Sequence, residues 1–559
     1  MKLHRISIAM LVALLFTASC NDIDNQEPQT GDLTADQSAE AVEDVPSRSN
    51  AAFAGLFNLM GKPCAVRPAN ERPDDFGFIM SAISLDLEGA DMAGNDNGYN
   101  WLSTASEYSS RNPNYANPTI RYQIAYMVIG AANEILASIP AETTSETLIN
   151  QMAQARAVRA YAYLFLAPYF QARYVDAKDK PCVPILESGT DFTNNPRATV
   201  KQVYNYILED LNYAVEHLEG YVRPDKSRVD QNVAYGLRAR AYLNMGKYAE
   251  AAADAEKAMK GYTPASMADV SKPAFCNMAT ESNWIWGINI TSEMIVDQPY
   301  ATAPSWMSAF AAENYAAGTD NLPMINKLLY NQISKTDVRH NWWLDENRHT
   351  PNWADIEWKD GSTVLAKGDA IADLTIKDVK MKYSAYSNVK FGMKNGGVSS
   401  VNDSDWPTMR VEEMILVNIE GLAKSGHEAE AKQKLIDFVK TYRDPEYTFP
   451  NPLAPNRNLE DEIWFQRRVE LWGEGFFVSD ARRLDKPIVR FHDNYPSNFS
   501  AAFQFNIKPN DEWLNLRFPK TETNNNLAVV NNEGGSQPVA GQNGELRDGV
   551  TNADGKTIK

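Results

Sequence analysis

A helix–turn–helix pattern in residues 235–264 constrains the fold of this chain more than any other feature. Ala239, Ala251 and Ala258 recur where small side chains let two antiparallel helices approach closely, and Gly246 supplies the turn between them. Such a unit cannot bury its apolar face alone, so it stacks against neighbouring helix pairs. The pattern therefore predicts a helical scaffold and not a large sheet.

The spacing of this unit is that of one tetratricopeptide repeat, and a weaker copy follows in residues 415–438. One position departs from the repeat, because Arg238 stands where a leucine is usual and Leu237 comes one residue early. An ordinary helical hairpin shares much of this pattern and stays open as an alternative. Two copies with further helices around them favour repeat-type packing. The positions that match are Tyr235, Ala239, Tyr242, Gly246, Tyr248, Ala251 and Ala258.

Three other segments show the apolar spacing of amphipathic helices, residues 118–139, 151–170 and the stretch that opens at Thr199. Thr199 and Gln202 form the sequence pattern of a helix-capping box. In the first segment we expect one buried stripe. It contains Ile124, Met127, Val128, Ala131 and Ile135.

Between the helical blocks, residues 61–115, 266–404 and 484–559 are rich in Asn, Gly, Pro, Trp and Tyr. Loops this long are usually functional or disordered, and nine of the twelve tryptophans lie in them, which favours folded loops. From about Asn524 aromatic residues disappear, and we expect part of that stretch to be disordered. The predicted fold is mainly α, a tetratricopeptide-like scaffold (about 33–60, 116–265 and 405–483) with an inserted, irregular, loop-rich lobe that contains a few short strands.

The first twenty residues have the layout of a secretory signal. Lys2 and Arg5 precede an apolar stretch that ends in small residues and Cys20. This arrangement is similar to the lipid-attachment site of bacterial lipoproteins, in which the cysteine is acylated after cleavage. We predict a lipoprotein signal peptide at 1–19, lipidation of Cys20, and a polar, flexible tether at 20–32.

Charge and cysteine content exclude several classes of protein. The net charge is −18 and no basic cluster occurs, so nucleic acid is not a predicted partner. Beyond the N-terminus no apolar run is long enough to span a membrane. Cys64, Cys182 and Cys276 match no zinc spacing, and we expect buried thiols, although a single disulfide stays open.

Catalytic and metal motifs are absent from the sequence. His427 and Glu428 begin like a zinc-protease helix, but Ala431 replaces the second histidine. An EF-hand register through Gly98 places Thr104 where a carboxylate is needed, so only another type of ion site stays open. We predict no catalytic residue, no metal and no cofactor. A glycan-cleaving carboxylate pair is not excluded by composition.

Several motifs in order resemble the SusD/RagB family of outer-membrane nutrient-binding lipoproteins of the Bacteroidota, over nearly the whole mature chain. Phe477 and Ala481 depart from the family pattern, which usually has a basic residue and a leucine there. The stretches that carry the resemblance are 154–163, 199–218, 406–414, Arg467 to Leu471, Gly473 to Gly475, Asp480 with Arg482 and Arg483, and Phe518 to Lys520 with Glu522 and Asn524.

The resemblance implies that residues 33–559 form a single SusD-like domain. It also implies a lipid-anchored, surface-exposed protein of the outer membrane that captures an oligomeric nutrient, most often a glycan. The implied partner is a SusC-like TonB-dependent transporter barrel, which the protein would cover like a lid, with the repeat face towards the barrel and the lobe holding the ligand.

A glycan site needs flat aromatic faces for the sugar ring and amides or carboxylates for its hydroxyls. Residues 91–107 supply both, in Tyr99, Asn100 and Trp101, at the position that the resemblance suggests for ligand contact. The second suggested set is Tyr300, Trp306 and Tyr315, and a third aromatic cluster is Trp342, Trp343, Trp353 and Trp358.

Four interpretations of function remain open from the sequence. The favoured one is a non-catalytic lipoprotein that binds an oligosaccharide or polysaccharide and delivers it to the transporter. In the second, the ligand of the same transport role is a peptide or another non-sugar nutrient. In the others the protein is a surface scaffold for other proteins, whose loop aromatics are all buried, or a glycan-cleaving enzyme.

Overall fold

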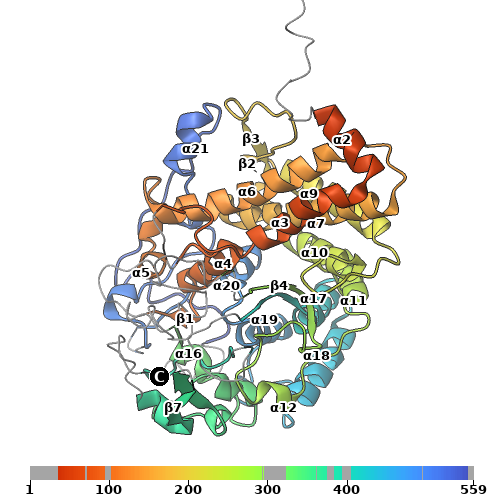
Figure 1. Ribbon diagram of the computed structural model, residues 1–559. Coiled ribbons are helices and arrows are strands. Elements are labelled where there is room, and N and C mark those ends of the chain that lie inside the picture. Colours follow the sequence, from red (N-terminus) through yellow and green to blue (C-terminus); the bar gives the residue numbers. More distant parts are fainter. Residues whose placement is uncertain are drawn as a thin grey trace, which may run out of the picture.

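A computed structural model shows a mainly α-helical chain with a few short strands, as predicted (Figure 1). The helices outside the repeat scaffold are mostly short. They are α2 (Ala35–Asp44), α3 (Asn50–Leu59), α4 (Gly77–Glu88), α5 (Ser103–Ser106), α8 (Tyr174–Ala177), α12 (Met267–Val270), α16 (Lys327–Tyr330), α20 (Phe477–Arg483) and α21 (Lys520–Asn525). The structure describes residues 35–69, 72, 74–94, 102–291, 294, 323–360, 362–373, 383–392, 394, 404–493, 495 and 497–551.

The scaffold is a series of helices in which each packs on the next. Helices α6, α7 and α9 lie across one end of the molecule in Figure 1, and α10, α11, α17 and α18 continue along one side. Residues 266–404 of the irregular lobe are inserted in the sequence between α11 and α17, yet these two helices pack together. The scaffold helices are α6 (Ala116–Ser138), α7 (Glu146–Phe170), α9 (Val200–His217), α10 (Gln231–Asn244), α11 (Tyr248–Ala258), α17 (Val411–Lys424), α18 (Glu428–Tyr442) and α19 (Leu459–Glu470).

The α10–α11 hairpin has the features that its sequence predicts. Ala239, Ala251 and Ala258 are fully buried between the helices, and Gly246 turns the chain with φ +73°, a conformation that favours glycine. Arg238, the departure from the repeat pattern, donates to the Asp254 carboxylate across the hairpin with an Nε···Oδ2 distance of 2.6 Å. An ion pair thus joins α10 to α11 at this position.

Helix α17 lies against α11 at a glycine. A Cβ atom on Gly421 would lie 2.6 Å from the carbonyl oxygen of Tyr248 and 2.9 Å from the Cβ of Ala252. Asn418, one turn earlier, donates its Nδ2 to the Ala252 carbonyl oxygen at 2.9 Å. The absence of a side chain at Gly421 therefore permits the contact that closes the scaffold around the inserted lobe.

We expect Gly421→Ala to lower the free energy of unfolding by about 1–3 kcal/mol, because the new methyl group overlaps the α11 backbone. The matched control is Gly130→Ala in α6, where no atom lies within 4 Å of the added Cβ. That change should raise stability by up to ~1 kcal/mol, since alanine favours helix. Urea unfolding of both variants measures the difference, and shifts of the same sign would contradict the close α11–α17 contact.

Among the described residues the strands form four two-stranded antiparallel sheets. The β4–β8 pair lies at the start of α17 and connects the lobe to the scaffold. The pairs are β1 (Met92–Ala93) with β5 (Met324–Ile325), β2 (Pro181–Pro184) with β3 (Arg197–Thr199), β4 (Trp284–Ile288) with β8 (Trp406–Arg410), and β6 (Glu357–Asp360) with β7 (Thr363–Lys367).

Helix ends and side-chain burial agree with most of the sequence-based expectations. The Thr199–Gln202 capping box starts α9, with both reciprocal hydrogen bonds formed. Cys64, Cys182 and Cys276 are buried free thiols, as expected. The placement of Met127 in the buried stripe of α6 is wrong, since its side chain is 38% exposed while Ile124, Val128 and Ile135 are buried.

The described residues of two segments predicted to be irregular or partly disordered are ordered. Helix α4, within the predicted loop region 61–115, is buried on all sides and therefore lacks the apolar stripe that would reveal it as a helix. From Asn524 to residue 551, where the described chain ends, the segment is fixed to the core, because Asp548 pairs with buried Arg468 at 2.7 Å and Val550 is fully buried. Its order depends on polar contacts and not on aromatic residues.

Candidate functional site

The residues predicted to contact ligand lie outside the described part of the chain, so their role stays a prediction. The same holds for the predicted lipidation site, Cys20, and for the segment boundaries 1–19 and 20–32. The predicted ligand-contacting residues are Tyr99, Asn100, Trp101, Tyr300, Trp306 and Tyr315.

The described ends of the two predicted segments meet in one sheet. Ala93, the last residue of β1, pairs with Met324, the first residue of β5. Because the strands are antiparallel, the chain leaves β1 towards residue 101 at the same end of the sheet at which it enters β5 from residue 315. The structure therefore brings the connections to both predicted segments together.

Polar contacts fix the opposite end of this sheet, where β1 begins and β5 ends. Asn326 donates its backbone N–H to the Asp91 carbonyl at 2.8 Å and its Nδ2 to the Ala90 carbonyl at 2.9 Å. Arg490 donates to the carbonyls of Gly89 and Ser106 at 2.9 and 2.7 Å. These contacts hold the end of α4, the start of β1 and helix α5 in one place.

The end of α4 also carries a buried charge cluster. The Glu88 carboxylate accepts hydrogen bonds from Arg111, at 2.7 Å from both guanidinium nitrogens, and from Arg121. Burial acts to raise the pKa of Glu88, but the two guanidinium groups outweigh it and lower that pKa to about 2. In the folded protein the Glu88 carboxylate therefore stays ionised at pH values well below the ordinary pKa of a glutamate.

Acid should weaken the fold through this carboxylate. Because the folded-state pKa of Glu88 is depressed from 4.5 to about 2, its stabilisation is complete above pH 4.5 and is lost as the pH falls towards 2. The loss is about 3 kcal/mol, from the shift alone. Thermal unfolding between pH 6 and 2.5 should show melting temperature falling below pH 4.5. A constant melting temperature over this range would contradict the depressed pKa.

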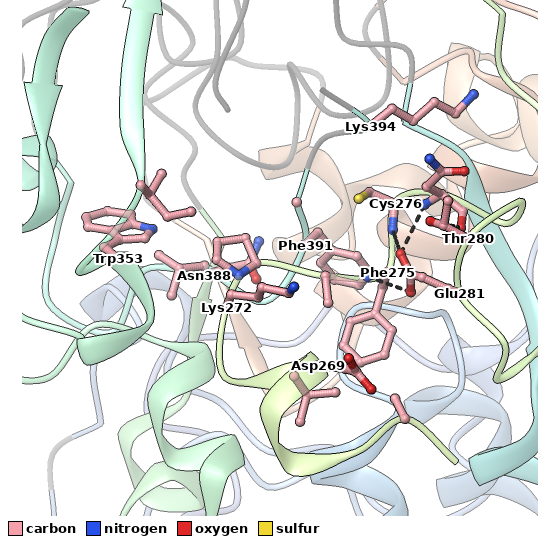
Figure 2. Close-up of a pocket in the computed structure, with 18 of the residues that line it drawn as sticks. Asp269, Lys272, Phe275, Cys276, Thr280, Glu281, Trp353, Asn388, Phe391 and Lys394 are labelled. Atoms are coloured by element: carbon pink, nitrogen blue, oxygen red, sulfur yellow. Dashed lines mark hydrogen bonds between the residues drawn. The ribbon is translucent and has the colours of Figure 1, made fainter. Parts of the chain in front are cut away.

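A cavity of about 530 Å³ lies in the irregular lobe, and we call it the lobe cavity (Figure 2). Residues 265–283 and 383–394 form much of its wall, and Trp353, Ile356 and Ile371 complete it. Asp269, Lys272, Thr280 and Ser282 line it and are exposed, so they mark its open side. The buried lining side chains include Val270, Phe275, Trp353, Tyr383, Val389 and Phe391.

Backbone pairing builds one wall of the lobe cavity. Ala274 donates its N–H to the Lys390 carbonyl at 2.9 Å, and Gly392 donates to the Ala274 carbonyl at 2.7 Å. A Cβ on Gly392 would lie 2.7 Å from the Pro273 carbonyl oxygen, so only glycine permits this approach. The wall thus joins two segments more than a hundred residues apart in the sequence.

The lining carboxylates are already engaged. Glu281 accepts three hydrogen bonds from the backbone N–H groups of residues 275–277 (Figure 2). It accepts a fourth from Trp284 Nε1. Burial raises the pKa of Glu281, and these hydrogen bonds oppose the rise. Exposed Asp269 accepts from the backbone N–H and the hydroxyl of Ser266, in the capping box that starts α12. Neither group is placed as a free general acid or base.

The third predicted aromatic cluster belongs mainly to the core. Trp342 and Trp343 are almost fully buried, and Trp353 packs edge-to-face on Tyr383 with ring centroids 5.1 Å apart. Trp358 lies in β6, and its side chain is outside the described set. Trp342 and Trp343 therefore pack the core, whereas Trp353 also lines the lobe cavity.

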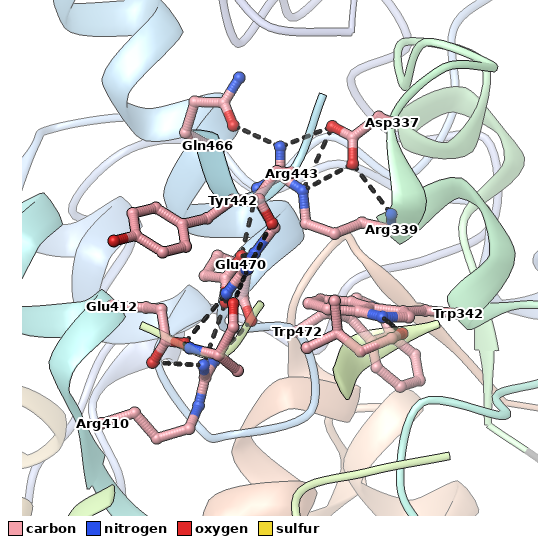
Figure 3. Close-up of polar contacts among 12 residues, drawn as sticks. Asp337, Arg339, Trp342, Arg410, Glu412, Tyr442, Arg443, Gln466, Glu470 and Trp472 are labelled. Atoms are coloured by element: carbon pink, nitrogen blue, oxygen red, sulfur yellow. Dashed lines mark hydrogen bonds and ion pairs between the residues drawn. The ribbon is translucent and has the colours of Figure 1, made fainter. Parts of the chain in front are cut away.

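A buried ion-pair network connects lobe and scaffold (Figure 3). The Glu470 carboxylate pairs with Arg443 at 2.8 Å, Arg410 at 3.0 Å and Arg339 at 3.3 Å. Arg339 comes from the lobe, whereas Arg443 and Arg410 belong to scaffold segments. Lys390, on the same segment as the cavity wall, donates to Glu474 at 2.7 Å. The network therefore holds the cavity wall on the scaffold.

Sequence reasoning missed the lobe cavity. Phe275, Asn388 and Phe391 belong to no local motif, and the segments that carry them meet only in the folded chain, through the pairing at Ala274 and the contact of the Phe275 and Phe391 rings. The aromatic content of residues 266–404 is the one available signal, and it does not distinguish lining residues from core residues. Within the described residues no helix has the length and apolar character needed to cross a membrane.

The fold is a helical repeat scaffold that supports a loop-rich lobe with a cavity. Two family models match the sequence. One, described as "Starch-binding associating with outer membrane", matches residues 80–243, and the SusD family model matches residues 301–534. The chain belongs to the SusD/RagB family. A search of curated proteins finds no significant match.

Solved structures share the fold over most of the chain. A SusD-like carbohydrate-binding protein from Bacteroides vulgatus is 21% identical, with a TM-score of 0.67 over 87% of this chain and 97% of its own. A SusD superfamily protein from Bacteroides thetaiotaomicron is also 21% identical, with a TM-score of 0.65 over 87% and 99%. Surface glycan-binding protein A from Bacteroides fluxus is 14% identical, with a TM-score of 0.60 over 88% and 99%.

Proposed function

We propose that this chain is a non-catalytic surface lipoprotein that binds an oligosaccharide and delivers it to a SusC-like TonB-dependent transporter in the outer membrane. The observation that carries the proposal is the pair of family matches, one of which is described as starch-binding and associated with the outer membrane. Family members with the same fold are described as carbohydrate- or glycan-binding proteins.

The lobe supplies the binding site in this proposal. Trp101 and Trp306 stack on sugar rings, and Tyr99, Asn100, Tyr300 and Tyr315 complete the contacts. The pairing of Ala93 with Met324 supports a single site, because the segments that carry Trp101 and Trp306 connect to the same end of the β1–β5 sheet. Acylated Cys20 anchors the chain in the outer membrane, and the tether at 20–32 lets the domain reach the barrel.

Native copurification tests the transporter partnership. The full-length chain, tagged at its C-terminus and extracted in mild detergent from its own cells, should retain one TonB-dependent barrel through affinity and size-exclusion steps. A tagged outer-membrane lipoprotein of another family, expressed in the same cells, is the control. Repeated recovery of this chain without any barrel would contradict the partnership, and recovery with several unrelated proteins would favour the scaffold alternative.

A further inference from the structure

We propose that the lobe cavity receives the acetamido group of an N-acetylated sugar, so that the captured glycan contains N-acetylhexosamine. This inference rests on the proposed function and names the class of sugar. The volume of about 530 Å³ falls within the range of small-ligand sites. The cavity also has the division typical of such sites, with an apolar interior and polar groups at its open side.

Most polar groups of the cavity wall are committed to protein partners. Glu281 is saturated by four N–H donors. Asn283 donates to both oxygens of Glu412, at 3.0 and 3.1 Å. Lys394 pairs with Asp405 at 2.6 Å. A sugar face with several hydroxyls would lose its water here without finding replacement hydrogen bonds, which disfavours its burial.

The buried amide of Asn388 differs from these groups. It lines the lobe cavity and is 4% exposed, and its Oδ1 accepts the Lys390 N–H at 3.0 Å, which fixes the orientation of the amide. Its Nδ2 has no hydrogen-bond partner within the described part of the chain. Buried amide donors are normally paired. The unpaired Nδ2 of Asn388 is therefore a position at which a ligand can supply the acceptor.

The chemistry of an acetamido group matches this wall. Its methyl carbon suits the apolar side chains of Val389, Ile371 and Trp353, and its single carbonyl oxygen can accept from Asn388 Nδ2. The sugar ring and its hydroxyls then stay at the open side, where Lys272 and Thr280 are exposed. A plain hexose offers no comparable apolar group with one acceptor.

A matched pair of ligands tests the class of sugar. The tetramer of β-1,4-linked N-acetylglucosamine and cellotetraose share linkage and length and differ by acetamido against hydroxyl. Oligomers of N-acetyllactosamine extend this set of ligands. Calorimetry on the chain beginning at residue 21, with each ligand titrated separately, should show that an acetamido glycan binds at least about tenfold more tightly than cellotetraose. Binding confined to glycans without acetamido groups would overturn this inference and leave the proposed function intact. Binding of peptides and of no glycan would overturn both.

Two variants locate the contact. Asn388→Leu removes the donor and should weaken binding of the acetamido glycan about tenfold. Asn352→Leu is the matched control, because Asn352 is also 4% exposed and its Nδ2 has no partner among the described residues, but it does not line the cavity. If Asn388→Leu fails to fold, Ile356→Trp serves as the second variant. Ile356 is a half-buried lining residue, and the larger side chain should block the cavity and weaken binding. Unchanged affinity in a folded lining variant, or equal losses in both asparagine variants, would overturn the inference.

Discussion

Glu470→Ala is expected to destabilise the protein by about 3–5 kcal/mol, a large share of the ~5–15 kcal/mol by which folded chains are typically stable. Glu470 is fully buried and balances the charges of Arg443, Arg410 and Arg339. Without it, guanidinium groups remain in an apolar interior with fewer partners. The cost of such an uncompensated charge exceeds what the ion pairs contribute when intact.

Chemical unfolding and the yield of soluble protein measure this effect. The matched control is Glu430→Ala in α18, whose carboxylate pairs with Lys434 at 3.4 Å on the surface. Because that pair is exposed to solvent, its loss should change stability by less than about 1 kcal/mol. Equal effects in the two variants would contradict the assignment of the buried network as the connection between lobe and scaffold.

Cys20→Ser is expected to release the protein from the membrane almost completely. In the proposed function, acylated Cys20 is the anchor, and several acyl chains hold a protein stably because each buried methylene contributes about 0.8 kcal/mol. A serine accepts no such thioether-linked lipid. Fractionation of cells should find the variant in the soluble fraction, whereas Asn25→Ala in the tether stays with the membrane. Membrane retention of Cys20→Ser would contradict lipid anchoring at this residue.

The sequence predicts those parts of the fold whose signal is local. Ala239 and Gly246 reveal the α10–α11 hairpin because small residues at this fixed spacing are typical of two closely packed antiparallel helices. Helix α4 escapes prediction because every face is buried, so hydrophobic periodicity is absent. The order of residues 525–551 escapes prediction because Asp548 gains its partner, Arg468, only in the folded structure.

The candidate site is less predictable than the scaffold. Trp342 and Trp101 are indistinguishable by composition, although the former is core and the latter is a proposed ligand contact. The lobe cavity depends on the pairing of Ala274 with Phe391, a long-range contact without a local signature. Buried charges such as Glu470 look like surface residues in a sequence, since their partners come from distant segments.

Oligosaccharide capture is the central claim, and a calorimetric titration of the chain beginning at residue 21 against a panel of plant and host oligosaccharides tests it most directly. We predict saturable binding to one class of glycan. That binding should be lost in Trp101→Ala or Trp306→Ala and retained in Phe192→Ala, which removes an aromatic ring that is 67% exposed elsewhere on the surface. Absence of saturable binding to every member of the panel would contradict the claim, as would equal loss in the Phe192 control.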